Sequence, residues 1–293
     1  MKLRAPEYYK DFKCIADKCS HSCCIGWEID VDEDTAEKYA SLSTGYGAQI
    51  ARSIEWDGTP HFRLAENDRC PHLDERGLCR IITDCGEDCL CHICREHPRF
   101  YNDTPYGKEV GIGMSCEEAA RIVLSSDGYA SMIEVGETED EENEFFFDSV
   151  GEREVVYSIL SDRSVLYEKR LLGLYERYGI SLGDISKGDV ADLEYLDEGH
   201  RALFLEYSSN NETSKEAEKM LERALAYFVY RHCTQAWDEE EFRVSLGFAL
   251  FCERLICSLV KLGIEITEAA RIVSEELEYS EDNTERIKNE FYT

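Results

Sequence analysis

The C-terminal half of the chain has hydrophobic residues at the spacing of α-helices. Apolar positions three and four residues apart predict one helix from Arg153 to Tyr178 and another from Leu221 to Trp237. Residues 264–277 carry a further helical pattern. The stretch from Leu246 to Leu262 is apolar on nearly every face, so we expect this helix to lie in the middle of a bundle. Residues 151–293 are therefore predicted to form a helical domain.

The first 130 residues lack such long patterns and are interrupted by Gly, Asp and Cys. Two short helices are predicted there, one from Asp32 to about Leu42 and one from Glu117 to Ser125. Residues 134–148 carry eight acidic groups and no basic one, which predicts a solvated linker over residues 131–150. The predicted fold is mainly α, with an irregular cysteine-rich metal-binding domain over residues 1–130 packed on the C-terminal helical bundle.

The charge of the chain narrows the choice of partners. Among 293 residues, 62 are acidic and 32 basic, for a net charge of −30. Such a surface repels phosphate backbones, so we expect no nucleic-acid partner, whereas a lysine-bearing protein would be attracted. The alternative is that the charge serves solubility alone.

The start of the chain has no apolar run, and no stretch of 18 apolar residues exists, so we expect no signal peptide, no membrane span and a cytoplasmic protein. The oligomeric state stays open.

Eleven of the 14 cysteines lie between Cys14 and Cys116. In a reducing compartment, cysteines at this density indicate metal or redox chemistry rather than structural disulfides. The alternative is a set of buried free thiols with one redox pair. The three later cysteines fall on apolar helix faces and are predicted to be buried structural thiols: Cys233, Cys252 and Cys257.

The spacing of the early cysteines favours an iron–sulfur cluster over zinc. Paired zinc ligands usually have the form Cys-x2-Cys, which only Cys91 and Cys94 show. The adjacent pair Cys23 and Cys24 fits a single tetrahedral zinc poorly, because neighbouring side chains diverge. The chain also lacks the Cys-x3-Cys-x2-Cys motif of radical S-adenosylmethionine enzymes and a glycine-rich nucleotide loop.

Polar and aromatic residues beside these cysteines are candidates for binding a ligand. Arg99 and His97 follow Cys94 closely and can clamp a carboxylate or tune a redox centre; the alternative is that Arg99 pairs with a nearby acidic residue and His97 faces solvent. Trp27 follows the first cysteine group and either stacks on a ligand or belongs to the core.

Several segments resemble the flagellin lysine N-methylase family in order and spacing. They are APEYYKDFKCIADKCSHSCCIGWEIDVD, RCPHLDERGLC, CHICREHPRF, GMSCEEAARIVLS, REVVYSILSDRSVLYEKRLLGL and the helix around Tyr227. The cysteine-rich half is also similar to a broader class of small zinc- or iron-chelating proteins of the CxxCxxCC type. That class shares the first cysteine group, the pair Cys70 and Cys79, and the segment from Cys94 to Pro98.

The resemblance implies methyl transfer from S-adenosylmethionine to lysine side chains of flagellin, with a [4Fe-4S] cluster taking part and zinc as the alternative metal. The resemblance implies that the cysteines of the family correspond to Cys14, Cys19, Cys23, Cys24, Cys70, Cys79, Cys91, Cys94 and Cys116 in this chain. Cys85 and Cys89 are additions to the family pattern. Nine thiolates exceed the needs of one four-ligand cluster, so either two centres exist or some cysteines only support the ligands.

The expected chemistry also needs a base, since a lysine must react as the neutral amine. Asp30, Glu28 and Tyr101 are candidates because they lie near the cysteine motifs in sequence, and we expect an acidic or tyrosine-lined pocket for the lysine. Arg99 and Trp27 are the candidates for binding S-adenosylmethionine. The alternatives are a different methyl acceptor, or a non-enzymatic zinc- or iron-binding protein that acts as a sensor, chaperone or electron-transfer module.

Overall fold

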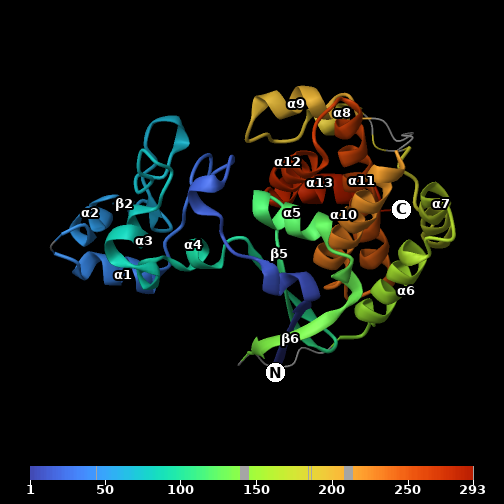
Figure 1. Cartoon of the computed structure of the whole chain (residues 1–293), viewed down its shortest axis with the longest axis horizontal. Coiled ribbons are helices and arrows are strands. Elements are labelled where there is room, and N and C mark those ends of the chain that lie inside the picture. Colours follow the sequence, from blue (N-terminus) through green and yellow to red (C-terminus); the bar gives the residue numbers. More distant parts are fainter. Residues whose placement is uncertain (44, 139–144, 184, 186, 208–213, 293) are drawn as a thin grey trace. The chain divides into compact units, whose positions relative to one another are not determined.

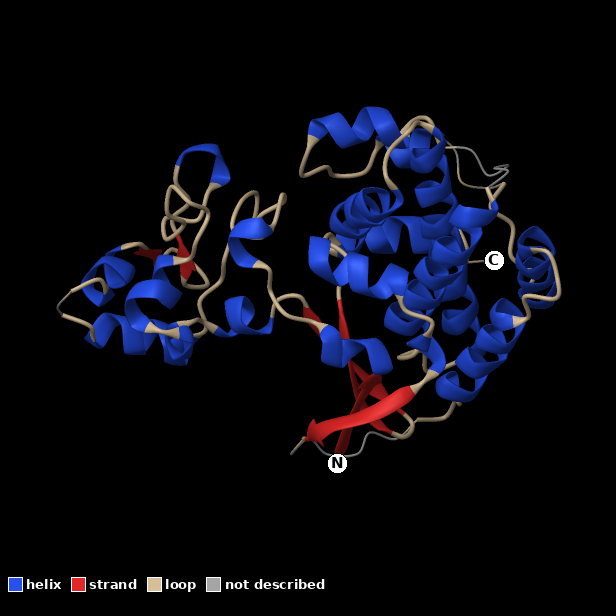
Figure 2. Cartoon of the chain, viewed as in Figure 1, coloured by secondary structure: helices blue, strands red, loops and turns tan. Residues whose placement is uncertain are grey.

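The computed structural model divides the chain into two compact units, which are described separately below. One unit is residues 13–98, and the other combines residues 1–12 with residues 99–293. Figure 1 colours the described residues, which are 1–43, 45–138, 145–183, 185, 187–207 and 214–292. The predicted mainly α fold class is confirmed, as Figure 2 shows.

These boundaries differ from the division expected from cysteine density, which placed residues 1–130 together. The first strand, β1 (Lys2–Pro6), pairs with β5 (Gly107–Ile112) and β6 (Met132–Glu137), and these pairings join both ends of the predicted first domain to the helical unit. Strand β6 also occupies part of the expected linker over residues 131–150. Residues 139–144 of that linker lie outside the described residues.

The sheet of the helical unit has the strand order β4-β5-β1-β6. Strand β4 (Arg99–Thr104) runs antiparallel to β5, and β5 runs parallel to β1. Gly111 on β5 allows a close approach of two rings, because a Cβ there would lie 2.3 Å from Phe100 and 2.8 Å from Tyr230. The sheet therefore packs tightly against α10, which carries Tyr230.

The helices of this unit surround one long central helix. Helix α11 is buried along most of its length, from Phe242 to Leu259, and packs against α9, α10, α12 and α13, which confirms its predicted position. The bounds of the helices are α5 (Glu117–Ser125), α6 (Ser149–Ser161), α7 (Tyr167–Tyr178), α8 (Lys187–Ala191), α9 (Glu198–Phe204), α10 (Lys215–Cys233), α11 (Glu239–Lys261), α12 (Ile266–Glu278) and α13 (Glu281–Asn289).

The predicted helix from Arg153 to Tyr178 is two helices. Helix α6 ends at Ser161, and α7 begins at Tyr167. Between them the Asp162 carboxylate accepts a hydrogen bond from the backbone N–H of Ser164 at 3.2 Å. Short polar side chains compete in this way with the helical backbone pattern, so the helix stops there even though the apolar spacing continues.

A buried ion pair joins the sheet to the helices. Arg153 on α6 lies 2.6 Å from the Glu109 carboxylate on β5, and both side chains are almost fully buried. The same guanidinium donates to the Thr234 hydroxyl at 3.1 Å. Removing one partner of such a pair leaves an uncompensated buried charge, so the pair fixes how β5 meets α6.

The unit of residues 13–98 is smaller and more irregular. Its elements are α1 (Glu33–Ser41), α2 (Gly47–Arg52), β2 (Ile54–Glu55), β3 (His61–Phe62), α3 (Arg80–Cys85) and α4 (His92–Glu96). Asp32 caps α1 by accepting from Thr35 N at 3.0 Å, and its other oxygen accepts from His92 N at 2.8 Å. One side chain thus starts α1, as predicted, and ties it to α4.

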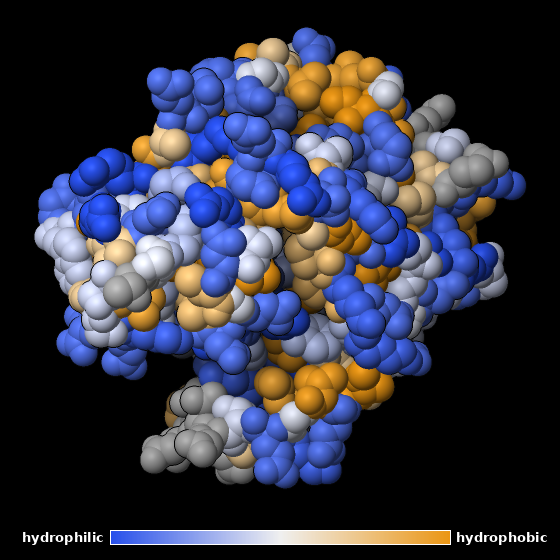
Figure 3. Space-filling model, turned by 60° about the vertical axis from the view of Figure 1, so that its left-hand side comes forward, coloured by the Kyte–Doolittle hydropathy of each residue, from blue (hydrophilic) through white to orange (hydrophobic). Residues whose placement is uncertain are grey.

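The hydrophilic composition is visible on the surface. The face shown in Figure 3 is largely hydrophilic, with several hydrophobic areas between the hydrophilic ones. Among the described residues, no helix combines the length and the apolar character that crossing a membrane requires.

Candidate metal centre

Backbone hydrogen bonds place the two cysteine groups of residues 13–98 side by side. The N–H of Cys70 donates to the carbonyl of Cys24 at 2.8 Å, and the N–H of Gly26 donates to the carbonyl of Asp68 at 2.9 Å. Gly26 has a positive φ of 85°, which a residue with a side chain rarely adopts. The chain therefore turns beside Cys24 and brings it to Cys70.

Two of the cysteines lie at helix starts, where nearby backbone N–H groups favour the ionised thiol. Cys79 is the N-cap of α3; burial raises its pKa, and the backbone N–H groups of Ile81 and Ile82 partly oppose this. Cys91 is the N-cap of α4, and the Cys94 thiol and backbone N–H lower its pKa. Such donors stabilise thiolates, which are the forms that bind metals.

Five thiols influence one another electrostatically: Cys24, Cys70, Cys79, Cys91 and Cys94. Burial and, to a smaller extent, the neighbouring thiols raise the pKa of Cys70 to about 12. A hydrogen bond from the Cys94 thiol lowers the pKa of Cys91 and raises that of Cys94. Thiols this close oppose one another's ionisation, and a bound cation removes that opposition.

Cys24 has a cationic neighbour that favours its ionised form. A hydrogen bond from Cys23 lowers the pKa of Cys24 to about 7, with smaller contributions from Ser22 and the charge of Arg69. Arg69 directly precedes Cys70, so the same turn that joins the cysteine groups also places this positive charge.

The sulfurs are spaced more widely than in a preformed zinc site. Among the described residues of 13–98, the set of three metal-binding atoms within 4.8 Å of one another is Glu55, Asp57 and His61, and no three cysteine sulfurs meet that limit. A tetrahedral site with Zn–S bonds of about 2.3 Å places its sulfurs about 3.8 Å apart. The thiols are therefore not already placed as the ligands of one tetrahedral zinc ion.

The remaining predicted ligands are arranged differently. Cys14 and Cys23 are exposed, and Cys19 donates to the carbonyl of His21 at 2.8 Å. Cys116 is the N-cap of α5 and belongs to the helical unit. Within residues 13–98, the structure thus brings together five of the nine predicted ligands. The three late cysteines are buried, as predicted.

The predicted catalytic and S-adenosylmethionine-binding residues are divided between the two units. Asp30 is exposed and Trp27 is partly buried in residues 13–98, whereas Arg99 and Tyr101 lie on β4 of the helical unit. Arg99 Nε donates to the Tyr9 hydroxyl at 2.9 Å. Tyr101 has 42% of its surface exposed.

Two residues of this unit, Tyr39 and His72, were not identified from the sequence as parts of the centre. The Tyr39 hydroxyl donates to the carbonyl of Cys89, and its pKa is raised by burial and by the nearby thiols. His72 contacts Tyr46 and Ser53 through its two ring nitrogens, both at 2.8 Å, and burial lowers its pKa to about 4. A neutral His72 that is held at both nitrogens supports the fold beside Cys70.

His97 is different, because one of its ring nitrogens is buried without a hydrogen-bond partner in the described part of the chain. Its Nε2 is buried and has no hydrogen-bond partner among the described residues, and burial lowers the pKa of the ring to about 4. The expected alternative of a solvent-facing His97 does not fit this burial. The signal in the sequence was its position three residues after Cys94.

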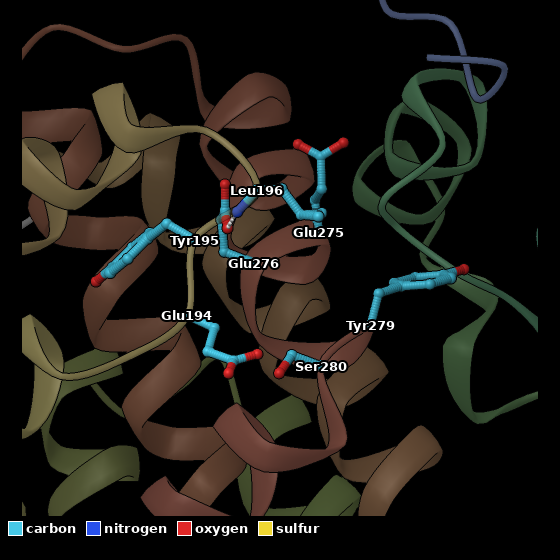
Figure 4. A pocket seen from close by; sticks show the side chains of 7 residues that line it. All are labelled: Glu194, Tyr195, Leu196, Glu275, Glu276, Tyr279 and Ser280. Carbon is cyan, nitrogen blue, oxygen red and sulfur yellow. Dashed lines mark hydrogen bonds between the residues drawn. The ribbon is translucent and has the colours of Figure 1, made fainter. Parts of the chain in front are cut away.

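The helical unit contains a separate acidic pocket of about 310 Å³ (Figure 4). Its lining residues are Glu194, Tyr195, Leu196, Glu275, Glu276, Tyr279 and Ser280. Glu276 accepts from the backbone N–H of Leu196 at 2.8 Å and hydrogen-bonds His200 at 2.6 Å, while Glu275 pairs with Arg271. Burial alone would lower the pKa of His200, but the hydrogen bond and charge of Glu276 outweigh it and raise that pKa.

The Glu194 carboxylate has no hydrogen-bond partner among the described residues, and in Figure 4 it lies on the same side of the pocket as the Ser280 hydroxyl. The pocket thus offers one unengaged carboxylate together with aromatic and hydroxyl groups. That lining suits a cationic side chain.

Comparison with known proteins finds similarity to flagellar and methylase proteins. The flagellar biosynthetic protein FliU of Salmonella muenchen is 29% identical over 131 residues, which cover 41% of this chain and 75% of that protein. Proteins named lysine-N-methylase from Salmonella choleraesuis and Salmonella typhimurium are each 30% identical over 137 residues, which cover 41% of this chain. The matched region spans 32% of the length of these two methylases.

No protein-family model matches the chain, and no solved structure does. The named relatives confirm the resemblance predicted from the sequence: over 41% of its length, the chain is similar to proteins of the flagellin lysine N-methylase family.

Proposed function

We propose that this chain takes part in the N-methylation of protein lysines, with S-adenosylmethionine as the methyl donor and flagellin as the acceptor. The similarity to proteins named lysine-N-methylase is the observation that carries the proposal. The name FliU of a further relative supports a flagellar acceptor. The strongly acidic composition favours an acceptor that presents positively charged lysines.

The proposed cofactor is an iron–sulfur cluster bound by thiolates. The residues that would hold it come from Cys24, Cys70, Cys79, Cys91 and Cys94, which are close enough to affect one another's ionisation. No three of their sulfurs lie within 4.8 Å of one another among the described residues, so they do not form a ready zinc site, and in a cluster each thiolate would bind a different iron. When bound, a cluster with an open iron site supplies a Lewis acid that can hold the amino and carboxylate groups of S-adenosylmethionine.

The residues of the chain must also prepare the acceptor lysine. A free lysine has a pKa of about 10.4 and is therefore protonated near neutral pH. Methyl transfer forms an N–C bond, breaks the C–S bond of the sulfonium and releases a proton from the amine. Asp30 and Tyr101 remain the proposed bases, and Arg99 and Trp27 the proposed contacts to the methyl donor.

The acidic pocket of the helical unit is the proposed binding site for the lysine side chain. Its free carboxylate, Glu194, would attract the ammonium group, and Tyr279 would contact the aliphatic stem. Replacing Glu194 with Gln is expected to raise the KM for a lysine-bearing acceptor severalfold. The same change at the exposed Glu239 of α11 is the matched control and should leave the KM unaltered.

The deciding experiment combines metal analysis with a methylation assay. The protein is purified without oxygen, its visible spectrum is recorded, and iron, zinc and acid-labile sulfide are measured. It is then incubated with flagellin and S-adenosylmethionine, and the lysine peptides are analysed by mass spectrometry. The proposal predicts near-equal iron and sulfide together with methylated lysines. Methylation by protein that holds no metal would refute the role of the cluster.

The same experiment separates the alternative functions. A colourless zinc protein that does not bind S-adenosylmethionine would favour a non-enzymatic metal-binding role. Reversible reduction of a cluster without any methylated product would favour electron transfer. Methylation of another protein but not of flagellin would support lysine methylation by this protein and would show that the acceptor is not flagellin.

A further inference from the structure

The β2–β3 hairpin gathers three metal-binding side chains at its loop end. Glu55 and His61 lie directly opposite each other in the two strands, and Asp57 lies in the loop between them. One ligand atom from each of the three residues lies within 4.8 Å of the other two. His61 Nε2 is 3.5 Å from Glu55 Oε2 and 3.9 Å from Asp57 Oδ1. A ring nitrogen and two carboxylate oxygens thus face one another.

Two further contacts orient these ligand atoms. His61 Nδ1 lies 2.9 Å from the carbonyl of Thr59, and because a carbonyl can only accept, Nδ1 carries a proton and donates it. Arg63 Nε donates to Oε1 of Glu55, which is the oxygen that faces away from His61. Histidines that bind metals commonly donate their other N–H to a carbonyl, and carboxylates that bind metals are held by hydrogen bonds in the same way. The hairpin therefore has the supporting contacts of a metal site.

The spacing of the three atoms suits a metal better than a hydrogen bond. When Nε2 is unprotonated, three acceptors face one another, and a cation between them removes their repulsion. A proton on Nε2 would be such a cation, but 3.5 and 3.9 Å exceed the usual N–H···O distance of about 2.7–3.2 Å. The ligands of a metal with bonds of about 2.0–2.2 Å lie about 3–3.5 Å apart. The Asp57 side chain is 77% exposed and can move the small remaining distance.

We propose that Glu55, Asp57 and His61 bind a divalent first-row transition metal, as a second site that contains no sulfur. One imidazole with two carboxylates suits ions such as Ni²⁺ and Zn²⁺, and water completes the coordination. Glu28 adds a further negative charge, since its carboxylate lies 3.8 Å from His61 Nδ1. Residues 53–63 contain no cysteine, so this site uses none of the thiolates of the proposed cluster.

The hairpin is joined to a segment that carries a proposed base. The N–H of Val31 donates to the carbonyl of Pro60 at 2.7 Å. The N–H of Phe62 donates to the carbonyl of Ile29 at 3.0 Å. Asp30 lies between these two contacts. A metal that holds β2 to β3 would thereby steady the backbone on both sides of Asp30, although the metal site itself does not depend on the role proposed for that residue.

The test maps Ni²⁺ on the protein whose cysteine centre is already loaded. Diethyl pyrocarbonate modifies the unprotonated nitrogen of accessible histidines, and a metal bound to that nitrogen blocks the reaction. The protein is treated at about pH 8, above the ordinary histidine pKa of about 6.5, with and without one equivalent of Ni²⁺. Trypsin releases residues 53–63, in which His61 is the one histidine. Ni²⁺ should slow the modification of His61 severalfold and leave the exposed His92 as reactive as before.

Calorimetric titration of three variants with Ni²⁺ completes the test. His61→Gln and Asp57→Asn should each weaken Ni²⁺ binding at least about tenfold. Asp34→Asn is the matched control, because it removes the same charge from an exposed position of α1, and it should bind Ni²⁺ as the unaltered protein does.

Three results would each overturn the proposal. Equal losses of affinity in Asp57→Asn and Asp34→Asn would mean that the acidic surface attracts the ion without a defined site. Unchanged binding in His61→Gln would place the ion elsewhere. A His61 that stays fully reactive with Ni²⁺ present would mean that the three side chains hold no metal. Mapping of the unaltered protein decides the question even if a variant folds poorly, and none of these readouts depends on methyl transfer.

Discussion

Replacing Gly111 with Ala tests whether the sheet of the helical unit is packed as tightly as the structure indicates. The new Cβ would lie 2.3 Å from Cζ and 2.7 Å from Cε1 of Phe100, and 2.8 Å from Cε1 of Tyr230. Carbon atoms in good contact are about 3.5–4.0 Å apart, so the Phe100 ring must move by about 1 Å or more. Phe100 lies between Arg99 and Tyr101, two proposed site residues, so the movement would disturb them as well.

The expected cost lies in the upper part of the range for overpacked interiors, about 2–3 kcal/mol, because rings from both β4 and α10 oppose the methyl group. For a unit of about 200 residues, 1 kcal/mol lowers the Tm by about 2–4 °C, so the total decrease should be about 4–12 °C. Thermal unfolding followed by circular dichroism measures it.

The matched control is Gly136→Ala on β6, in the same sheet, where a Cβ meets nothing within 4 Å. This variant should keep the Tm within about 1–2 °C of the unaltered protein. Adding Phe100→Leu to Gly111→Ala should restore part of the lost Tm, because the smaller side chain at position 100 leaves room for the added methyl group. Equal Tm values for the variants at positions 111 and 136 would refute the packing argument.

The remaining predictions concern charge, metal and pH. Glu109→Gln should destabilise the protein by about 3–5 kcal/mol in denaturant unfolding, because Arg153 would stay buried without its carboxylate; a loss below about 1 kcal/mol would contradict this. Cys94→Ala should reduce bound metal at least about tenfold, whereas Cys257→Ala, in the buried face of α11, should retain it. The folded protein raises the pKa of His200, so protonated His200 stabilises the fold fully below about pH 6.5, and this stabilisation is lost as the pH rises through the pKa of His200 in the folded protein. The difference in unfolding free energy between the unaltered protein and His200→Gln should therefore shrink as the pH rises. A difference that stays constant with pH would refute the assignment.

The helical part of the fold was predictable where periodicity alone decides the structure. The apolar run from Leu246 to Leu262 identified α11 as the central helix, and the acidic start at Asp32 located α1. The break after Ser161 was not predictable from apolar spacing, because it depends on a local hydrogen bond of Asp162. The sheet was missed because a strand such as Lys2–Pro6 has no clear alternation and becomes a strand only through partners distant in sequence.

The candidate site shows the same division between local and distant information. Cysteine spacing predicted thiols for a metal, since that depends on residue type and density. Which five of these thiols lie together depends on the turns that join Cys24 to Cys70, and no local sequence pattern predicts that contact. The partner of Arg99 is Tyr9, which is 90 residues away, where the sequence had offered a nearby acidic residue as the alternative.

The order of the two units along the chain constrains the order in which they fold during synthesis. The ribosome makes β1 before residues 13–98, and it makes the strands that pair with β1 only after them. The N-terminal strand must therefore wait, with its backbone groups unpaired, while the cysteine-rich unit forms. Once β4 emerges, Arg99 meets Tyr9 and Phe12, so the two chain connections to the inserted unit leave the helical unit at neighbouring points. An insertion with adjacent ends can be exchanged for a short turn, which makes the helical unit separable by deletion at residues 13–98.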